Sequence, residues 1–161
     1  MNEQTASASW DGAVLSEGLK RIRFRRAMTP GEVAAGMHMP LRTYQRFEAG
    51  RTRINIEQIY RFAAVTRSDP QAILHAVAIG SPAYALRACD NQMSTIVTVG
   101  VKNFNDLMGD RIQALDSRTV ANAVIRMFSE LAASLGGGDP AADWLEQGVN
   151  DLNARRPKPG R

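Results

Sequence analysis

Apolar residues recur at intervals of three and four along most of this 161-residue chain, a spacing typical of amphipathic α-helices. Capping residues, prolines in a first turn and glycine after a last turn mark the ends of five such helices in the first half. These signals predict helices that begin near Ser16, Thr29, Pro40, Asn55 and Asp69. Residues 1–13 are small and polar, and we expect them to be disordered.

The helical spacing continues in the second half of the chain. One apolar stripe runs through residues 93–115 and another through residues 117–135, so the sequence predicts two helices joined by a two-residue turn. A short last helix is expected within residues 139–152. Residues 153–161 are rich in arginine, lysine and proline, and we expect a basic disordered tail there.

The predicted fold is therefore all-α, with two helical regions at residues 14–80 and 92–152. Residues 81–91 follow Gly80 and begin with Ser81-Pro82, so they are predicted to be the linker. The hydrophobic fraction of 44% is enough for a packed core, and the single cysteine excludes an internal disulfide. Because the chain has neither a secretory signal nor a clean apolar stretch of about 18 residues, we expect a cytoplasmic protein with no membrane contact.

Charge is distributed unevenly along the chain, although the net charge is only +4. Residues 16–67 hold eleven Lys or Arg against four Glu, whereas residues 68–150 hold five basic against nine acidic residues. A basic module beside an acidic one is typical of proteins in which one part binds a polyanion. Solvated charge on helix faces gives the same composition, so the local motif has to decide between the two.

The most informative motif is TPGEVAAGMHMPLRTYQRFEAG at residues 29–50. Two short helices flank a tight turn, with the small residue Ala34 where the helices touch. Apolar residues fall on the positions that lock such a pair together: Val33, Met37, Met39, Tyr44 and Phe47. The motif resembles the helix-turn-helix of the lambda-repressor and Cro-like regulators, the xenobiotic-response-element family, and the resemblance covers residues 16–79.

This resemblance implies a five-helix lambda-repressor-like DNA-binding domain over residues 14–80, whose third helix reads DNA. It also implies a buried ion pair between Arg23 and Glu48, and it selects Leu41, Arg42 and Arg46 as residues that contact bases. Three positions depart from the family pattern. Proline stands at 30 in place of glutamine and at 40 in place of a serine cap, and His38 fills a turn position usually held by glycine.

Helix geometry supports the same assignment independently of the resemblance. On the third helix, Leu41, Arg42, Gln45 and Arg46 lie on one face, and Thr43 is a further candidate for base contact. The two arginines suit guanine, glutamine suits adenine or phosphate, and leucine suits the thymine methyl group. Residues expected to contact phosphate are Thr29, Arg51 and Arg53, from a helix start and from the loop after the third helix.

A single helix-turn-helix contacts too few base pairs to select a site in a genome, so we expect a homodimer on a pseudo-palindromic operator. The predicted helical hairpin is the candidate dimerisation region, because a hairpin alone cannot cover both of its apolar faces. The residues expected at the dimer interface are Phe104, Leu107, Met108, Val124, Met127, Phe128 and Leu131.

These observations favour a nucleoid-associated transcription regulator whose partner is double-stranded DNA, and repression rather than activation. RNA polymerase or another protein is a further candidate partner. Two alternatives stay open: an antitoxin that represses its own synthesis, and an adaptor whose helices bind a protein rather than DNA. An enzyme is not expected, because no nucleophile, base or metal-ligand set is recognisable, and we expect no cofactor.

Overall fold

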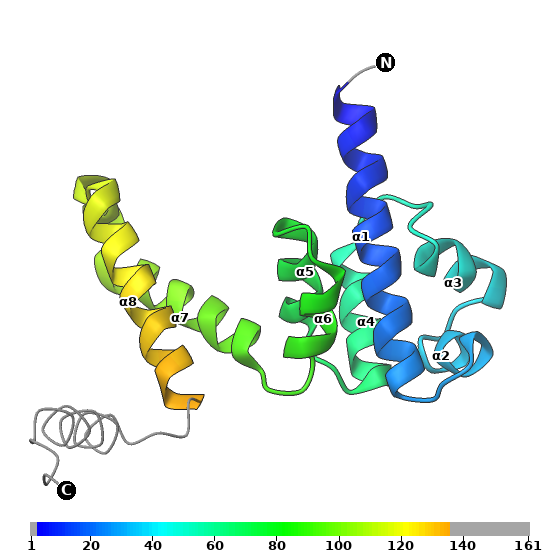
Figure 1. The fold of residues 1–161 in the computed structure, drawn as a ribbon. Helices are drawn as coiled ribbons and strands as arrows, with labels where there is room; N and C mark the ends of the chain where they lie inside the picture. Colours follow the sequence, from blue (N-terminus) through cyan, green and yellow to red (C-terminus); the bar gives the residue numbers. More distant parts are fainter. Residues whose placement is uncertain (1–2, 136–161) are drawn as a thin grey trace, which may run out of the picture. The chain divides into compact units, whose positions relative to one another are not determined.

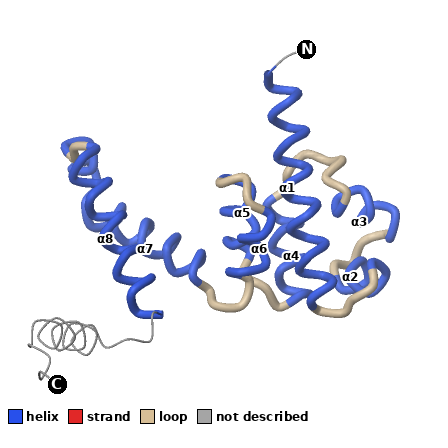
Figure 2. The backbone as a smooth tube through the Cα atoms, viewed as in Figure 1, coloured by secondary structure: helices blue, strands red, loops and turns tan. Residues whose placement is uncertain are grey.

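The computed structural model describes residues 3–135, and every regular element among them is a helix (Figures 1 and 2). Along the chain these are α1 (Glu3–Arg25), α2 (Pro30–Gly36), α3 (Leu41–Glu48), α4 (Ile56–Thr66), α5 (Pro70–Ala78), α6 (Pro82–Ala88), α7 (Met93–Met108), the 3-10 helix η1 (Gly109–Ala114) and α8 (Ser117–Leu135). The prediction of an all-α chain is confirmed for these residues. The last helix and the basic tail predicted at residues 139–161 lie outside the described part.

The starts of α2, α4 and α5 follow the capping residues that the sequence indicates. The Thr29 hydroxyl accepts a hydrogen bond from the Glu32 amide, Asn55 caps α4, and Asp69 caps α5. Helix α3 has no side-chain cap, because it follows Pro40; the Thr43 amide instead donates to the Pro40 carbonyl at 2.9 Å. His38 has a φ of 54°, the left-handed conformation expected of this turn.

The core of the first compact unit, Met1–Gly109, forms around α1. Helix α1 contacts α3 on one side and α5 and α6 on another, while α2 packs on α3 and α4 (Figure 1). Side chains from six helices meet there and are at most 2% exposed: Leu15, Leu19, Ile22, Val33, Tyr44, Phe47, Ile59, Phe62, Ile73 and Ala85. This packing fixes α3 with one face inside the unit and the other on its surface.

Helix α1 corrects the prediction that residues 1–13 are disordered and that the first helix starts at Ser16. The helix starts at Glu3 and ends at Arg25, two residues before the predicted end. Small polar residues without proline are compatible with helix, and tertiary contacts overrode the compositional signal. The backbone of Gly12 is buried against Gly50, and the ring of Trp10 lies on Gly80.

The predicted linker at residues 81–91 is also wrong, because it contains α6 and belongs to the core. Ser81 and Pro82 start this helix, as cap position and first helical residue, rather than marking a domain boundary. Ala85 and Ala88 are buried, and their small side chains allow close packing on α1. The chain divides after Gly109 instead, so the first unit is larger than the predicted residues 14–80.

The buried carboxylate of Asp69 joins the start of α7 to α5 within the first unit. Asp69 Oδ1 accepts hydrogen bonds from the Gln71 amide at 2.8 Å and from the Thr95 hydroxyl at 2.6 Å, and Oδ2 accepts one from the Thr95 amide at 3.0 Å. The same side chain therefore caps α5 and holds the first turn of α7. Ser94 beside it is fully buried.

The connection between α7 and α8 is longer than the predicted two-residue turn. It includes η1 and ends at Asp116, whose carboxylate accepts a hydrogen bond from the Thr119 amide at 3.0 Å and so caps α8. The hydrogen bonds from Thr119 lower the pKa of Asp116. Within residues 3–135, no helix has the length and hydrophobicity needed to cross a membrane.

Candidate nucleic-acid interface

Helix α3 is short and strongly two-sided. Its buried side chains, Tyr44, Phe47 and Glu48, recur at intervals of three and four and pack into the first unit. The intervening residues are exposed, and they are the predicted base-contacting set: Leu41, Arg42, Thr43, Gln45 and Arg46. The amphipathic pattern therefore leaves every predicted base contact on the surface of α3.

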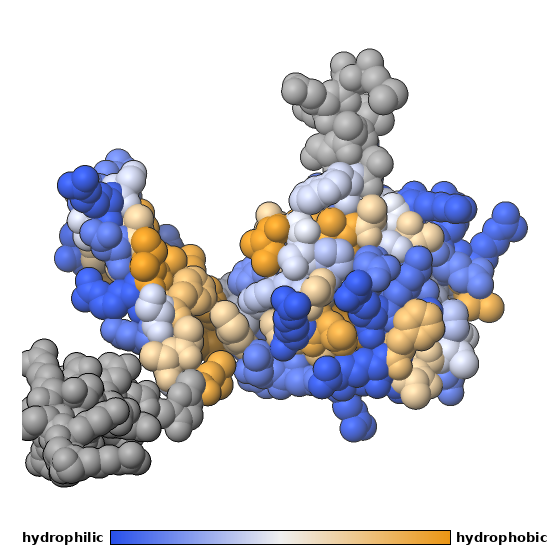
Figure 3. Space-filling view, in the orientation of Figure 1, coloured by the Kyte–Doolittle hydropathy of each residue, from blue (hydrophilic) through white to orange (hydrophobic). Residues whose placement is uncertain are grey.

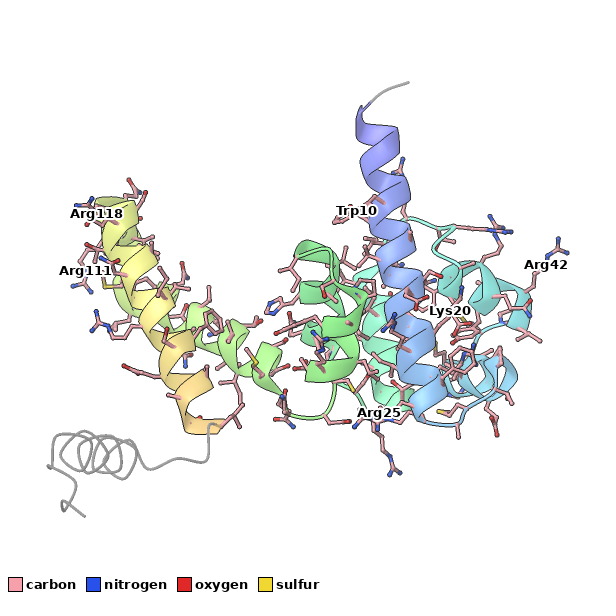
Figure 4. The ribbon with its side chains drawn as sticks, viewed as in Figure 1. Trp10, Lys20, Arg25, Arg42, Arg111 and Arg118 are labelled. Atoms are coloured by element: carbon pink, nitrogen blue, oxygen red, sulfur yellow. The ribbon has the colours of Figure 1, made fainter. Side chains whose placement is uncertain are left out.

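Three of the predicted base-contacting residues lie together with one residue predicted to contact phosphate. Arg42, Gln45 and Arg46 from α3 and Arg51 from the following loop line an open surface depression of about 480 Å³. In Figure 4 the Arg42 side chain points away from the body of the unit. Leu41, Thr43 and Arg53 are also exposed, but they do not line the depression. The structure thus places three arginines and one amide side chain around one hollow.

The charge of this surface is not compensated locally. Between Glu32 and Glu57 the chain has one acidic residue, Glu48, and its carboxylate is buried in an ion pair. Among residues 3–135, no carboxylate oxygen lies within 4.0 Å of the guanidinium groups that surround the depression, whereas the surface arginines Arg21 and Arg61 each pair with a glutamate one turn away. Figure 3 shows hydrophilic surface over the region of α3. Such a surface attracts anions.

Thr29 is not arranged to bind phosphate as predicted. Its amide and its hydroxyl both donate to the Glu32 carboxylate, at 2.7 Å and 2.8 Å. The hydrogen bonds from Thr29 lower the pKa of Glu32, so this carboxylate is charged at neutral pH. A phosphate at this helix start would have to displace Glu32 and would meet its negative charge.

The ion pair that the resemblance implies is present and is bidentate. Arg23 Nε lies 2.6 Å from Glu48 Oε1 and Nη2 lies 3.2 Å from Oε2, and both residues are at most 7% exposed. Arg23 Nη1 also donates to the Met28 carbonyl at 3.1 Å. The hydrogen bonds to Glu48 raise the pKa of Arg23 against the opposing effect of burial. This pair joins α1 to the last turn of α3.

Sequence reasoning missed a third member of this cluster, Tyr44. Its hydroxyl donates to Glu48 Oε1 at 2.7 Å, so the carboxylate accepts from two elements at once. Tyr44 precedes Glu48 by four residues on α3, the spacing at which helix side chains meet. That spacing could have indicated the hydrogen bond to Glu48. Tyr44 was instead assigned to the apolar contacts between the two helices, which already accounted for an aromatic residue at this position.

The Tyr44 hydroxyl makes stability sensitive to alkaline pH. Burial raises its pKa, and the hydrogen bond to Glu48 raises it further, whereas an unfolded tyrosine ionises near pH 10. The stabilising effect is therefore complete below about pH 10, and the free energy of unfolding falls as the pH rises above it. Urea titrations at about pH 8 and about pH 11 should show a smaller fall for Tyr44→Phe than for the unmodified chain. Equal falls would contradict this role.

The residues predicted for a dimer interface lie on two helices. Phe104, Leu107 and Met108 belong to α7, and the remaining four belong to α8: Val124, Met127, Phe128 and Leu131. Met108 is half-buried, and the other six are exposed. Large apolar side chains on the surface are compatible with an interface, and dimerisation stays a prediction.

No family model, characterised protein or solved structure matches this chain in the comparisons. Among residues 3–135, His, Cys, Asp and Glu form no group that could hold a metal ion. Cys89 is buried, and burial raises the pKa of its thiol. The arginine-lined depression is therefore the strongest candidate functional site in the described part of the chain.

Proposed function

We propose that this chain is a sequence-specific DNA-binding transcription regulator that binds a pseudo-palindromic operator as a homodimer. The observation that carries the proposal is the cluster of Arg42, Gln45, Arg46 and Arg51 around one open depression beside α3. An α-helix fits the DNA major groove, where side chains reach the edges of the bases. The resemblance of residues 16–79 to lambda-repressor and Cro-like regulators favours the same function.

The exposed side chains of α3 offer distinct chemistry to bases and to phosphates. Arg42 and Arg46 are one turn apart, and each can donate two parallel hydrogen bonds to guanine O6 and N7. Gln45 between them can donate to and accept from adenine. Arg51 lies after the helix, where a charge suits the phosphate backbone better than a base edge.

The buried cluster of Arg23, Tyr44 and Glu48 stabilises the position of α3 from its buried face. It holds the last turn of α3 against α1, so the side chains on the opposite face keep their position before DNA arrives. A rigid helix loses less conformational entropy on binding. Two copies on a two-fold axis would place their α3 helices about 34 Å apart, one turn of DNA. Repression is the simpler outcome, because occupancy of a promoter is sufficient for it.

Selection of bound sequences from random DNA, followed by titration of the best site at two salt concentrations, tests the proposal. We expect affinity to fall steeply with salt, since phosphate contacts release counterions. Arg42→Ala and Arg46→Ala should each cost about 1–3 kcal/mol on the best site and relax preference at one or two base pairs. Arg51→Ala should weaken specific and random DNA alike and reduce the salt slope by about one.

Arg87→Ala is a matched control, because Arg87 is exposed on α6 and does not line the depression. It should leave both affinity and sequence preference unchanged. If the three variants near α3 lose the same affinity on specific and random DNA, the base-reading assignment is wrong. If the unmodified chain selects no sequence and shows no salt-dependent binding, the proposed function is wrong.

A further inference from the structure

Near Trp10 and Gly12, helix α1 packs between two turns that contain glycine, one at Gly50 and one at Gly80. Trp10 and Gly12 are two positions apart, or about 200° around the helix axis, so they face opposite sides of α1. On one side Gly12 meets Gly50, the residue that closes α3; a Cβ atom on Gly12 would lie 2.6 Å from the Gly50 carbonyl oxygen. On the other side the Trp10 ring lies on Gly80, between α5 and α6 (Figure 4).

Neither turn has room for a side chain at these contacts. A Cβ on Gly50 would lie 2.0 Å from the Gly12 carbonyl oxygen, and one on Gly80 would lie 2.2 Å from Trp10 Cη2. Both turn glycines also have positive φ, +65° and +67°, which other residues adopt only with strain. Gly12 therefore packs directly against Gly50, and the Trp10 ring packs directly against Gly80, which leaves no free space at either contact.

Gly50 is connected to the candidate DNA interface by backbone hydrogen bonds at the end of α3. The Gly50 amide donates to the Phe47 carbonyl at 2.9 Å, and the Arg51 amide donates to the Arg46 carbonyl at 3.1 Å. Arg42 also lines the depression, but it lies one turn before Arg46, at the other end of α3. Arg51 follows Gly50 directly in the chain, so of the lining arginines it lies nearest to this contact along the backbone.

We propose that Trp10 is a positioning residue for the DNA interface: by resting on Gly80 it keeps α1 pressed against Gly50 and so fixes Arg51. The Arg23–Glu48 pair holds α3 to the C-terminal end of α1, eleven residues after Gly12, and Trp10 supplies the second attachment. Trp10 is 55% exposed, so it lies at the edge of the unit and outside the buried core. The DNA readout of this inference rests on the proposed function, but its structural readout does not.

The first measurement uses the full chain without DNA. In Trp10→Ala, amide hydrogen exchange at Gly50 and Arg51 should accelerate between about 2- and 30-fold, while exchange in α4 stays the same. Trp10→Phe, which keeps a flat ring, should restore much of the protection. Ile79→Ala removes an exposed apolar side chain from the same turn and should leave Gly50 and Arg51 unchanged. If Trp10→Ala does not fold, Trp10→Leu replaces it, because leucine keeps apolar volume without the flat ring.

The second measurement is a pair of double-mutant cycles on DNA affinity. If Trp10 acts through Arg51, the losses from Trp10→Ala and Arg51→Ala should be non-additive, whereas those from Trp10→Ala and Arg42→Ala should add. Trp10→Ala should also lower the salt slope, as Arg51→Ala does. A purely structural role would raise exchange throughout the unit and couple to neither arginine.

The two parts of the experiment fail separately. Unchanged amide exchange at Gly50 and Arg51, or losses of affinity that add fully with Arg51→Ala, would overturn the positioning role of Trp10. Absence of DNA binding by the unmodified chain would overturn the proposed function, and amide exchange would still decide whether Trp10 fixes Gly50.

Discussion

Glu48→Ala is expected to lower the free energy of unfolding by about 3–5 kcal/mol. The substitution leaves the Arg23 guanidinium buried without its carboxylate, and it also removes the acceptor of the Tyr44 hydroxyl. An unpaired buried charge costs far more than the net contribution of the pair itself. Urea denaturation followed by circular dichroism measures the change, and DNA affinity should fall with it because α3 loses the ion pair that holds its last turn to α1.

Two variants separate the buried charge from the packing. Glu48→Gln keeps the shape and one acceptor, so it should cost less than Glu48→Ala. The double variant Arg23→Met with Glu48→Leu removes both charges and should be more stable than Glu48→Ala alone. An unchanged midpoint for Glu48→Ala would show that this pair does not hold the fold together.

Local signals in the sequence predicted the starts of α2, α4 and α5 well, but not those of α1 and α6. Thr29, Asn55 and Asp69 each satisfy amide groups of the helix that directly follows them, so the information lies within a few residues. The extent of the first unit could not be read in this way. Helix α6 has Ser81 and Pro82 at its start, a signal shared by linkers and helix starts, and only packing on α1 distinguishes the two.

In the candidate interface too, features set by nearby residues were predictable from the sequence, whereas contacts between distant residues were not. Helical spacing alone placed Arg42, Gln45 and Arg46 on one face, and the structure joins Arg51 to them. Thr29 was predicted to contact phosphate, but its amide and its hydroxyl already donate hydrogen bonds to Glu32, which belongs to the same motif. The contact of Gly12 with Gly50 joins residues 38 positions apart. Because glycine has no side chain, its presence in the sequence does not indicate which residue it will contact.

Phe128→Asp is expected to dissociate the homodimer that we propose. If the apolar side chains of α7 and α8 meet a second copy, a carboxylate at residue 128 would be buried there, at a cost of several kcal/mol. That cost corresponds to a dimer more than about a hundredfold weaker. Phe104→Asp should act in the same way on α7. Both rings are less than half exposed, 41% and 44%, so each substitution also removes existing contacts.

Sedimentation of the full chain at about ten micromolar, with circular dichroism to confirm folding, distinguishes dissociation from unfolding. Asn122→Asp is the matched control, because it adds the same charge to α8 away from the apolar stripe and should leave a dimer intact. The dissociated chain should still bind a half-site, with weak affinity and the same base preference. A dimer that survives both aspartate substitutions would place the interface elsewhere. A monomeric unmodified chain would favour the adaptor alternative, in which these helices bind a different protein.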